Sequence, residues 1–189
     1  MTRIGIFITA TLALVSGLAL WNWTSNLYEQ DTKSLIHEEM SPYVFENEGF
    51  KIMFPMPPQN VKDTIVEPET EEVKHYSTYL SQNAKGTFFV VNVISYPNYE
   101  GDLKDKMNQL LELMVKMDPQ NSIVEKDQQD FQGYPSIRYL IKGPNKSITA
   151  QAMEINDKVY LISTMSLSNQ YDPNEFDIFL NSFQLIPEE

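Results

Sequence analysis

The sequence has no cysteine, two histidines and far fewer basic than acidic residues. Without cysteine there can be no disulfide framework, thiolate zinc site, iron–sulfur cluster or cysteine nucleophile. Two histidines are too few for a histidine-rich metal site. The 14 Lys and Arg against 26 Asp and Glu give a net charge of −12. Nucleic-acid binding requires basic side chains that displace counterions from phosphates. We therefore expect no nucleic-acid partner, no metal and no cofactor.

The composition favours a folded domain. Hydrophobic residues make up 42% of the chain, with 10 Tyr and 10 Phe, which is too apolar for a disordered protein. The strong periodic segments all lie within residues 43–189. We expect this region to be a single domain that folds alone, stabilised by its core without disulfides.

An uncharged segment lies near the N-terminus. Residues Ile4–Trp21 contain no ionisable side chain over 18 positions. A membrane span needs roughly 20 such residues, whereas the apolar core of a signal peptide has ~7–15. Trp21 ends the segment and Trp23 follows it, at the position where aromatic residues are common at a membrane interface. Residues 1–23 are therefore predicted to be an uncleaved signal-anchor.

A cleaved signal peptide stays open as the alternative, because Gly17-Leu18-Ala19 is a small-x-small triplet of the kind cut by signal peptidase. Lipoprotein processing is excluded, since no Cys follows. In both cases Arg3 stays inside and the chain from Thr24 onward is exported. Residues 24–42, of mixed polarity, are interpreted as a tether.

Most of the domain has the sequence pattern of strands. One helical segment lies between the strands and a second follows them. The second helix has Asp172 as N-cap, Pro173 in its first turn and Glu175 three residues after the cap. Its apolar stripe is Phe176, Phe179, Leu180 and Phe183. The segment Thr87–Tyr96 is almost entirely apolar, which predicts a central strand covered on both faces. The predicted strands are Phe50–Phe54, Val73–Leu80, Thr87–Tyr96, Ile123–Phe131, Pro135–Lys142, Ser147–Ile155 and Lys158–Leu167.

The first helix is predicted from Asp102, as N-cap, to Met117. Its apolar side chains are Leu103, Met107, Leu110, Leu111, Met114 and Met117. Short turns between the later strands imply antiparallel neighbours. The fold class is therefore α+β, with a mostly antiparallel sheet and helices packed on it.

Several segments, in this order, resemble the PsbP-like family, which includes the extrinsic photosystem II subunit and bacterial DcrB-like envelope proteins. They are GFKIMFP (Gly49–Pro55), SYP (Ser95–Pro97), FQGYPSIRYLI (Phe131–Ile141), KVYLISTMS (Lys158–Ser166) and FLNSFQLIP (Phe179–Pro187). The resemblance implies an α/β/α sandwich around an antiparallel sheet. It implies little about function, because members bind different partners and most are not enzymes. No functional residue is carried over.

No catalytic set emerges from the sequence. His37 lies in the tether, and His75 is interpreted as a surface residue of a strand, with no G-x-S-x-G motif to accompany either. The turn Gly143–Ser147 lacks the glycines of a phosphate loop and lies between two strands. The acidic segment Glu67–Glu72 could bind a cation such as calcium loosely, but a solvated loop is the preferred interpretation. We therefore name no catalytic, cofactor-binding or metal-binding residue.

Two further features could face a partner. The Met-bearing stripe of the first helix could do so, although its spacing favours the core. Five tyrosines could line a groove, although strand aromatics more often pack across a sheet. These are Tyr76, Tyr79, Tyr96, Tyr99 and Tyr134.

The sequence thus predicts a membrane-anchored or exported envelope protein that acts as a non-catalytic binding or structural module with a protein partner. The alternative is an enzyme, or an accessory subunit of one, that uses carboxylate or tyrosine acid–base chemistry. A deep pocket with two converging carboxylates would favour the alternative, and a shallow surface would favour the module.

Overall fold

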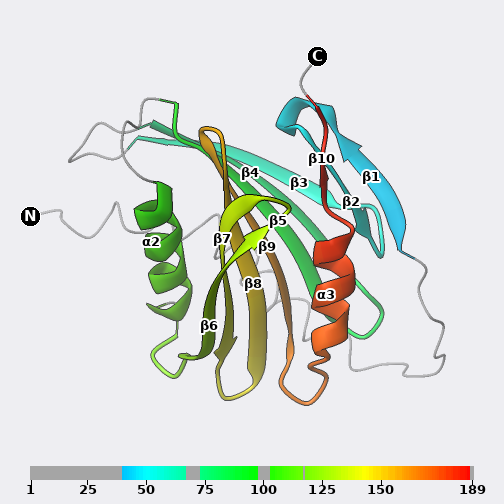
Figure 1. Ribbon diagram of the computed structural model, residues 1–189. Coiled ribbons are helices and arrows are strands. Elements are labelled where there is room, and N and C mark those ends of the chain that lie inside the picture. Colours follow the sequence, from blue (N-terminus) through cyan, green and yellow to red (C-terminus); the bar gives the residue numbers. More distant parts are fainter. Residues whose placement is uncertain (1–39, 67–72, 98–102, 117, 188–189) are drawn as a thin grey trace, which may run out of the picture.

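The computed structural model describes residues 40–66, 73–97, 103–116 and 118–187 (Figure 1). Several predicted features lie outside these ranges: the anchor, the tether up to residue 39, the acidic segment Glu67–Glu72, and Asp102 and Met117 at the ends of the first helix. Within the part of the chain that the structure describes, none of the helices has both the length and the apolar character needed to cross a membrane.

A seven-stranded antiparallel sheet forms the centre of the domain, in the order β3-β4-β5-β9-β8-β7-β6. The short turns predicted between consecutive strands connect β6 to β7, β7 to β8 and β8 to β9. The α+β class with an antiparallel sheet is therefore confirmed. The strands are β3 (Gln59–Val66), β4 (Val73–Gln82), β5 (Phe88–Ser95), β6 (Ser122–Phe131), β7 (Tyr134–Lys142), β8 (Lys146–Ile155) and β9 (Lys158–Leu167).

Strand β5 lies beside β9, the middle strand of the sheet, and both of its faces are covered, as predicted. Ile94 packs into the core on one face, while Val91 and Val93 pack into the core on the other. A strand buried in this way needs apolar residues at consecutive positions, which explains its nearly unbroken apolar sequence.

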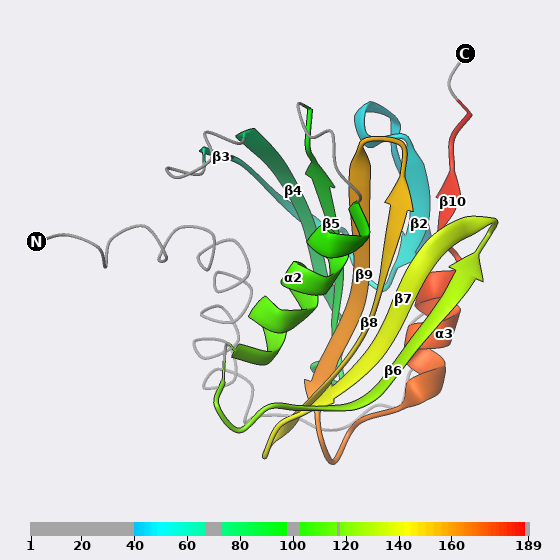
Figure 2. The ribbon, with the colours of Figure 1, turned by 60° about the vertical axis from the view of Figure 1, so that its left-hand side comes forward.

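The helix α2 (Leu103–Lys116) lies across one face of the large sheet (Figure 2). Its buried side chains join the core formed with β5, β7, β8 and β9, as the core interpretation of the stripe predicted. These are Met107, Leu110, Leu111 and Met114.

The opposite face is covered by the helix α3 (Pro173–Asn181) and by a small sheet of three strands in the order β1-β2-β10. These strands are β1 (Ser41–Phe45), β2 (Phe50–Phe54) and β10 (Gln184–Leu185), and a 3-10 turn, η1 (Glu46–Glu48), connects the first two. Strand β1 includes Ser41 and Pro42, which the sequence placed in the tether. The layers are thus one helix, the large sheet, and then a helix with a small sheet (Figure 1).

The helix α3 begins as predicted, with Asp172 accepting a hydrogen bond from the main-chain nitrogen of Asn174 at 2.9 Å. Phe176, Phe179 and Leu180 are buried. Phe183 lies beyond the end of the helix, contrary to the predicted stripe, because the helix ends at Asn181. Its ring is nevertheless 1% exposed and packs in the same core.

Candidate functional site

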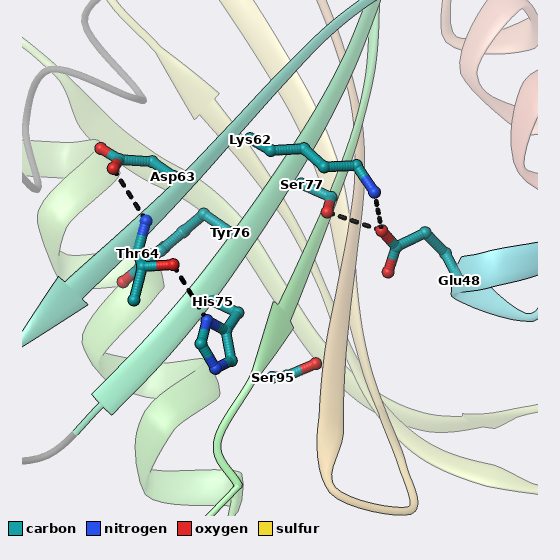
Figure 3. Close-up of a pocket in the computed structure, with 8 residues that line it drawn as sticks. All are labelled: Glu48, Lys62, Asp63, Thr64, His75, Tyr76, Ser77 and Ser95. Atoms are coloured by element: carbon teal, nitrogen blue, oxygen red, sulfur yellow. Dashed lines mark hydrogen bonds and ion pairs between the residues drawn. The ribbon is translucent and has the colours of Figure 1, made fainter.

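The surface is hollowed where the small sheet meets the β3–β4 edge of the large sheet. One cavity has a volume of about 540 Å³ and a second about 420 Å³. Both are open to solvent, and Glu48 and Lys62 line both of them. The first cavity is lined by Glu48, Lys62, Asp63, Thr64, His75, Tyr76, Ser77 and Ser95 (Figure 3).

Local backbone geometry places Glu48 in this position. Gly49 ends the η1 turn at a φ of 76°, a left-handed conformation that glycine adopts without strain. Its N–H donates to the carbonyl of Phe45 at 3.0 Å. The turn therefore brings Glu48 over the large sheet, where Lys62 of β3 lies directly opposite Ser77 of β4.

The Glu48 carboxylate connects the two sheets. Its Oε1 accepts hydrogen bonds from Lys62 Nζ at 2.9 Å and from Ser77 Oγ at 2.7 Å. The Tyr79 hydroxyl also donates to it, at 3.4 Å. The Glu48 side chain is 12% exposed, compared with 55% for Lys62. The carboxylate is thus held at the junction by donors from two strands of the large sheet.

These contacts set the ionisation of the cluster. Burial alone raises the pKa of Glu48, but hydrogen bonds from Ser77 and Lys62 and the charges of Lys62 and Lys158 outweigh it, so the pKa lies below its usual value. The hydrogen bond to Glu48 raises the pKa of Lys62. Burial and the Glu48 charge raise the pKa of Tyr79. At neutral pH the carboxylate is therefore charged and the phenol is protonated.

His75 is exposed on β4, which confirms its interpretation as a surface strand residue. Its Nδ1 lies 3.0 Å from Thr64 Oγ1, and Ser95 of β5 lies directly opposite it. A serine hydrolase would need a carboxylate behind the imidazole. Thr64 occupies that place, so the Ser95 and His75 pair lacks the orienting acid.

The two carboxylates that line the first cavity do not converge. Alternation along β3 puts Lys62 on the face that Glu48 covers and Asp63 on the other. Figure 3 shows Asp63 at the far end of the group from Glu48, and its Oδ1 accepts the main-chain N–H of Thr64 at 2.8 Å. Among the described residues, no cluster of three or more His, Asp or Glu side chains could hold a metal ion.

The tyrosines do not share a groove. Tyr76 and Tyr96 pack with the core under α2, whereas Tyr79 and Tyr134 pack with the core on the opposite face. The turn Gly143–Asn145 connects the strands β7 and β8, as predicted. A phosphate loop would precede a helix instead. His37, Tyr99 and the Glu67–Glu72 segment lie outside the described residues.

Sequence reasoning did not single out Glu48 or Lys62. The two residues are 14 positions apart, and β3, which carries Lys62, was not predicted. The local signal was an acidic residue before a glycine, which is too common to indicate a site. Their proximity results from the way the small sheet folds over the large one.

No family model matches this chain, and no curated protein matches it. Among solved structures, the chain is similar to the solution structure of cyanobacterial PsbP (CyanoP) from Synechocystis sp. PCC 6803. The TM-score is 0.53 at 13% sequence identity, covering 83% of this chain and 98% of that chain. At this identity the likeness shows the fold alone. The chain has a PsbP-like α+β fold, as the sequence resemblance implied.

Proposed function

We propose that the protein is a non-catalytic binding module, held at the outer face of a membrane by residues 1–23 and separated from it by the tether. The uncharged segment Ile4–Trp21 and the flanking Trp21 and Trp23 support the anchor. Arg3 on the inner side supports export of the domain. A cleaved signal peptide, which would leave an exported domain without an anchor, is the alternative for residues 1–23.

The observation that carries the non-catalytic proposal is the state of Glu48. Its Oε1 already accepts from Lys62 and Ser77, and its pKa is lowered rather than raised. A general acid at neutral pH needs the opposite shift. Asp63, the other acid at the first cavity, lies on the other face of β3. Among the described residues, the two carboxylates at this cavity therefore do not converge, which argues against acid–base chemistry by a carboxylate pair.

The enzyme alternative would have to use Glu48 with Tyr79, the place where a carboxylate and a phenol meet, at 3.4 Å. The lowered pKa of Glu48 and the raised pKa of Tyr79 keep both groups away from titration near neutral pH. These pKa shifts favour a structural role for Glu48 and Tyr79.

We assign the two open hollows beside Glu48 to a protein partner.

Protease treatment of intact spheroplasts that express the full chain tests the location. We expect the domain to be released by protease outside the membrane, with an intact N-terminus in the membrane fraction by mass spectrometry. A mature N-terminus near Gly17-Leu18-Ala19 in a soluble exported fraction would replace the anchor with a cleaved signal peptide. Protection of the domain would contradict export.

Site-specific photo-crosslinking tests the binding surface. A photoreactive amino acid at position 44, where Val44 lines the second cavity and is 58% exposed on β1, should give a discrete adduct with a membrane or envelope protein. The matched control is position 178, where Ile178 is 58% exposed on α3. Equal labelling at both positions, or none at position 44, would argue against this surface.

A further inference from the structure

A row of polar side chains crosses four neighbouring strands on the face of the large sheet that the small sheet partly covers. Thr64 of β3 lies opposite His75 of β4, which lies opposite Ser95 of β5, which lies opposite Lys158 of β9. Directly opposite residues in antiparallel strands share a face, with Cβ atoms ~4.5–5.5 Å apart. The four side chains are therefore neighbours on one surface.

The small sheet does not bury this row. The next row inward contains Val93 and Tyr160, which are 1% and 3% exposed and belong to the core under the small sheet. By contrast, His75 is exposed, while Ser95 and Lys158 are half-buried. Ser95 also lines the cavity of about 540 Å³. Its short side chain lies between the longer ones of His75 and Lys158, which leaves room above it.

The hydrogen-bonding capacity of the row is largely unused. Within residues 40–66, 73–97, 103–116 and 118–187, the Ser95 hydroxyl makes no hydrogen bond and the Lys158 ammonium makes no ion pair or hydrogen bond. The His75 ring uses Nδ1 for Thr64 Oγ1, and its Nε2 makes no hydrogen bond to the described residues. Three groups from adjacent strands can thus bind one ligand group.

The charge around the row favours an anion. Lys158 lies on the Glu48 side of the large sheet, because Tyr160, two residues further along β9, packs in the core under the small sheet. Lys62 already pairs with Glu48 at 2.9 Å. The Asp63 carboxylate belongs to the other face of β3. The Lys158 charge therefore has no carboxylate within ion-pair distance among the described residues, although the chain as a whole carries −12.

We infer that His75, Ser95 and Lys158 bind the oxyanion group of a ligand, either a carboxylate or a phosphate. The Lys158 ammonium supplies the charge, the Ser95 hydroxyl donates a hydrogen bond from the centre, and Thr64 positions the His75 ring. Charge-assisted hydrogen bonds of this kind are stronger than neutral ones. This site lies at the first of the two hollows assigned to a protein partner, but small-anion binding here and crosslinking at the second hollow are measured separately, so either proposal can fail without the other.

NMR titration of the isotope-labelled full chain in neutral detergent micelles tests the site, with sodium phosphate and sodium acetate as separate probes at constant ionic strength. We expect saturable shifts of the Ser95 amide and the His75 ring with at least one probe. The probe that binds more tightly identifies the oxyanion as phosphate or carboxylate. Absence of saturable shifts with both probes would overturn the inference.

Matched variants distinguish a site from general charge attraction. Lys158→Gln should weaken binding by roughly tenfold, the effect of losing one hydrogen bond to a charged group. The control Lys116→Gln removes the same charge from an exposed position on α2 and should leave the dissociation constant unchanged. Ser95→Ala should weaken binding without changing the charge. Equal effects of Lys158→Gln and Lys116→Gln, or no effect of Ser95→Ala, would also overturn the inference.

Discussion

The hydroxyl of Tyr160, on the middle strand of the large sheet, donates a hydrogen bond to the main-chain carbonyl of Glu48 at 2.7 Å. The same glutamate uses its side chain to accept from Lys62 and Ser77. Main chain and side chain of one residue thus connect the η1 turn to three strands, β3, β4 and β9. This arrangement fixes the small sheet over the large one at the place where the cavities form.

Removing the hydroxyl alone should weaken this connection. Tyr160→Phe keeps the ring, which packs edge-on against Phe50 and Phe183, but leaves the Glu48 carbonyl without this donor. We expect the free energy of unfolding to fall by about 1–2 kcal/mol, measured by urea denaturation. Tyr134→Phe, at a half-buried ring in the same core, is the control and should change it by less than about 0.5 kcal/mol.

The Glu48 carboxylate should make stability depend on pH. Because its pKa is lower in the folded protein than its usual value of 4.5, ionised Glu48 stabilises the fold above that value. This contribution is lost as the pH falls below 4.5 through the folded pKa. Glu48→Gln should therefore cost about 1 kcal/mol at pH 7, and the difference from the wild type should shrink in acid. A difference that stays constant from pH 7 to pH 3 would contradict this assignment.

The sequence predicted the elements whose patterns come from local chemistry. The apolar strand β5 and the capped helix α3 both have side chains whose spacing reflects burial. Strands β1 and β3 were missed, because Pro42 interrupts the first and most side chains of the second face solvent at a sheet edge. Edge strands are often polar, since exposed apolar edges would associate.

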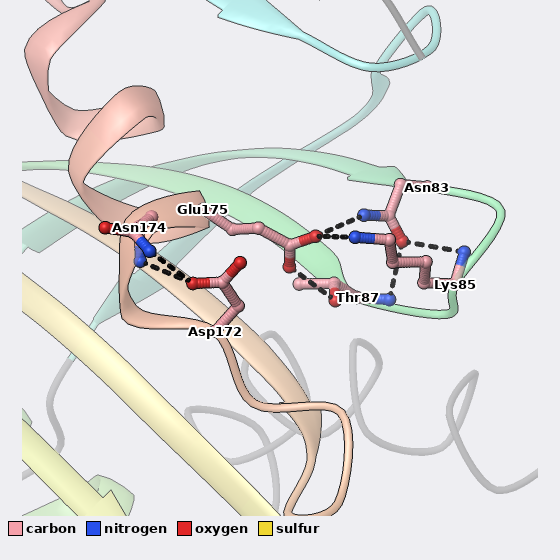
Figure 4. A network of polar contacts seen from close by, with 6 residues as sticks. All are labelled: Asn83, Lys85, Thr87, Asp172, Asn174 and Glu175. Carbon is pink, nitrogen blue, oxygen red and sulfur yellow. Dashed lines mark hydrogen bonds and ion pairs between the residues drawn. The ribbon is translucent and has the colours of Figure 1, made fainter. Parts of the chain in front are cut away.

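The candidate site was missed for a different reason. Glu175 shows the same limit on a smaller scale, because the sequence indicated only that it lies three residues after the Asp172 cap. In the structure its carboxylate accepts from Asn83, Lys85 and Thr87 at the β4–β5 turn (Figure 4). These donors are far away in the chain, so no local pattern contains them. The contacts of Glu48 depend on tertiary structure in the same way.

The Glu175 contacts should stabilise the docking of α3. Glu175→Gln retains the size of the side chain but removes the charge that Lys85 approaches at 3.2 Å and Thr87 at 3.0 Å. We expect a loss of about 1 kcal/mol in thermal or urea unfolding. Glu112→Gln, whose exposed partner Lys116 is one turn away on α2, should cost no more than about 0.5 kcal/mol. A smaller loss for Glu175→Gln than for Glu112→Gln would mean that the turn does not hold α3.

Phe183 should be among the most sensitive core positions. Its ring is 1% exposed and lies 5.6 Å from the ring of Phe50 in a stacked arrangement. Phe183→Ala should lower the free energy of unfolding by about 3–5 kcal/mol, because it leaves a cavity between α3 and the small sheet. Ile178→Ala, at a position 58% exposed on the helix α3 that precedes Phe183, is the control. A loss below about 1 kcal/mol for Phe183→Ala would show that this segment is not docked as described.

Gly143, in the β7–β8 turn, lies against a buried amide. A Cβ at this position would be 2.6 Å from Oδ1 of Asn121, closer than real Cβ contacts come. Asn121 is 8% exposed, and its Nδ2 donates to the carbonyl of Met114 at 3.3 Å, near the end of α2. The amide therefore cannot move aside without disturbing that contact, and Gly143→Ala should cost about 1–3 kcal/mol.

A double-mutant cycle separates this clash from a simple backbone effect. In an Asn121→Ala background the obstructing oxygen is absent, so Gly143→Ala should cost about 1 kcal/mol less than in the wild type, as coupled neighbours do. Urea denaturation of the four proteins measures the coupling. Additive losses would show that the Asn121 side chain is not what excludes a methyl group at position 143. The cost of a Cβ at position 143 would then come from the backbone conformation of the turn and not from contact with Asn121.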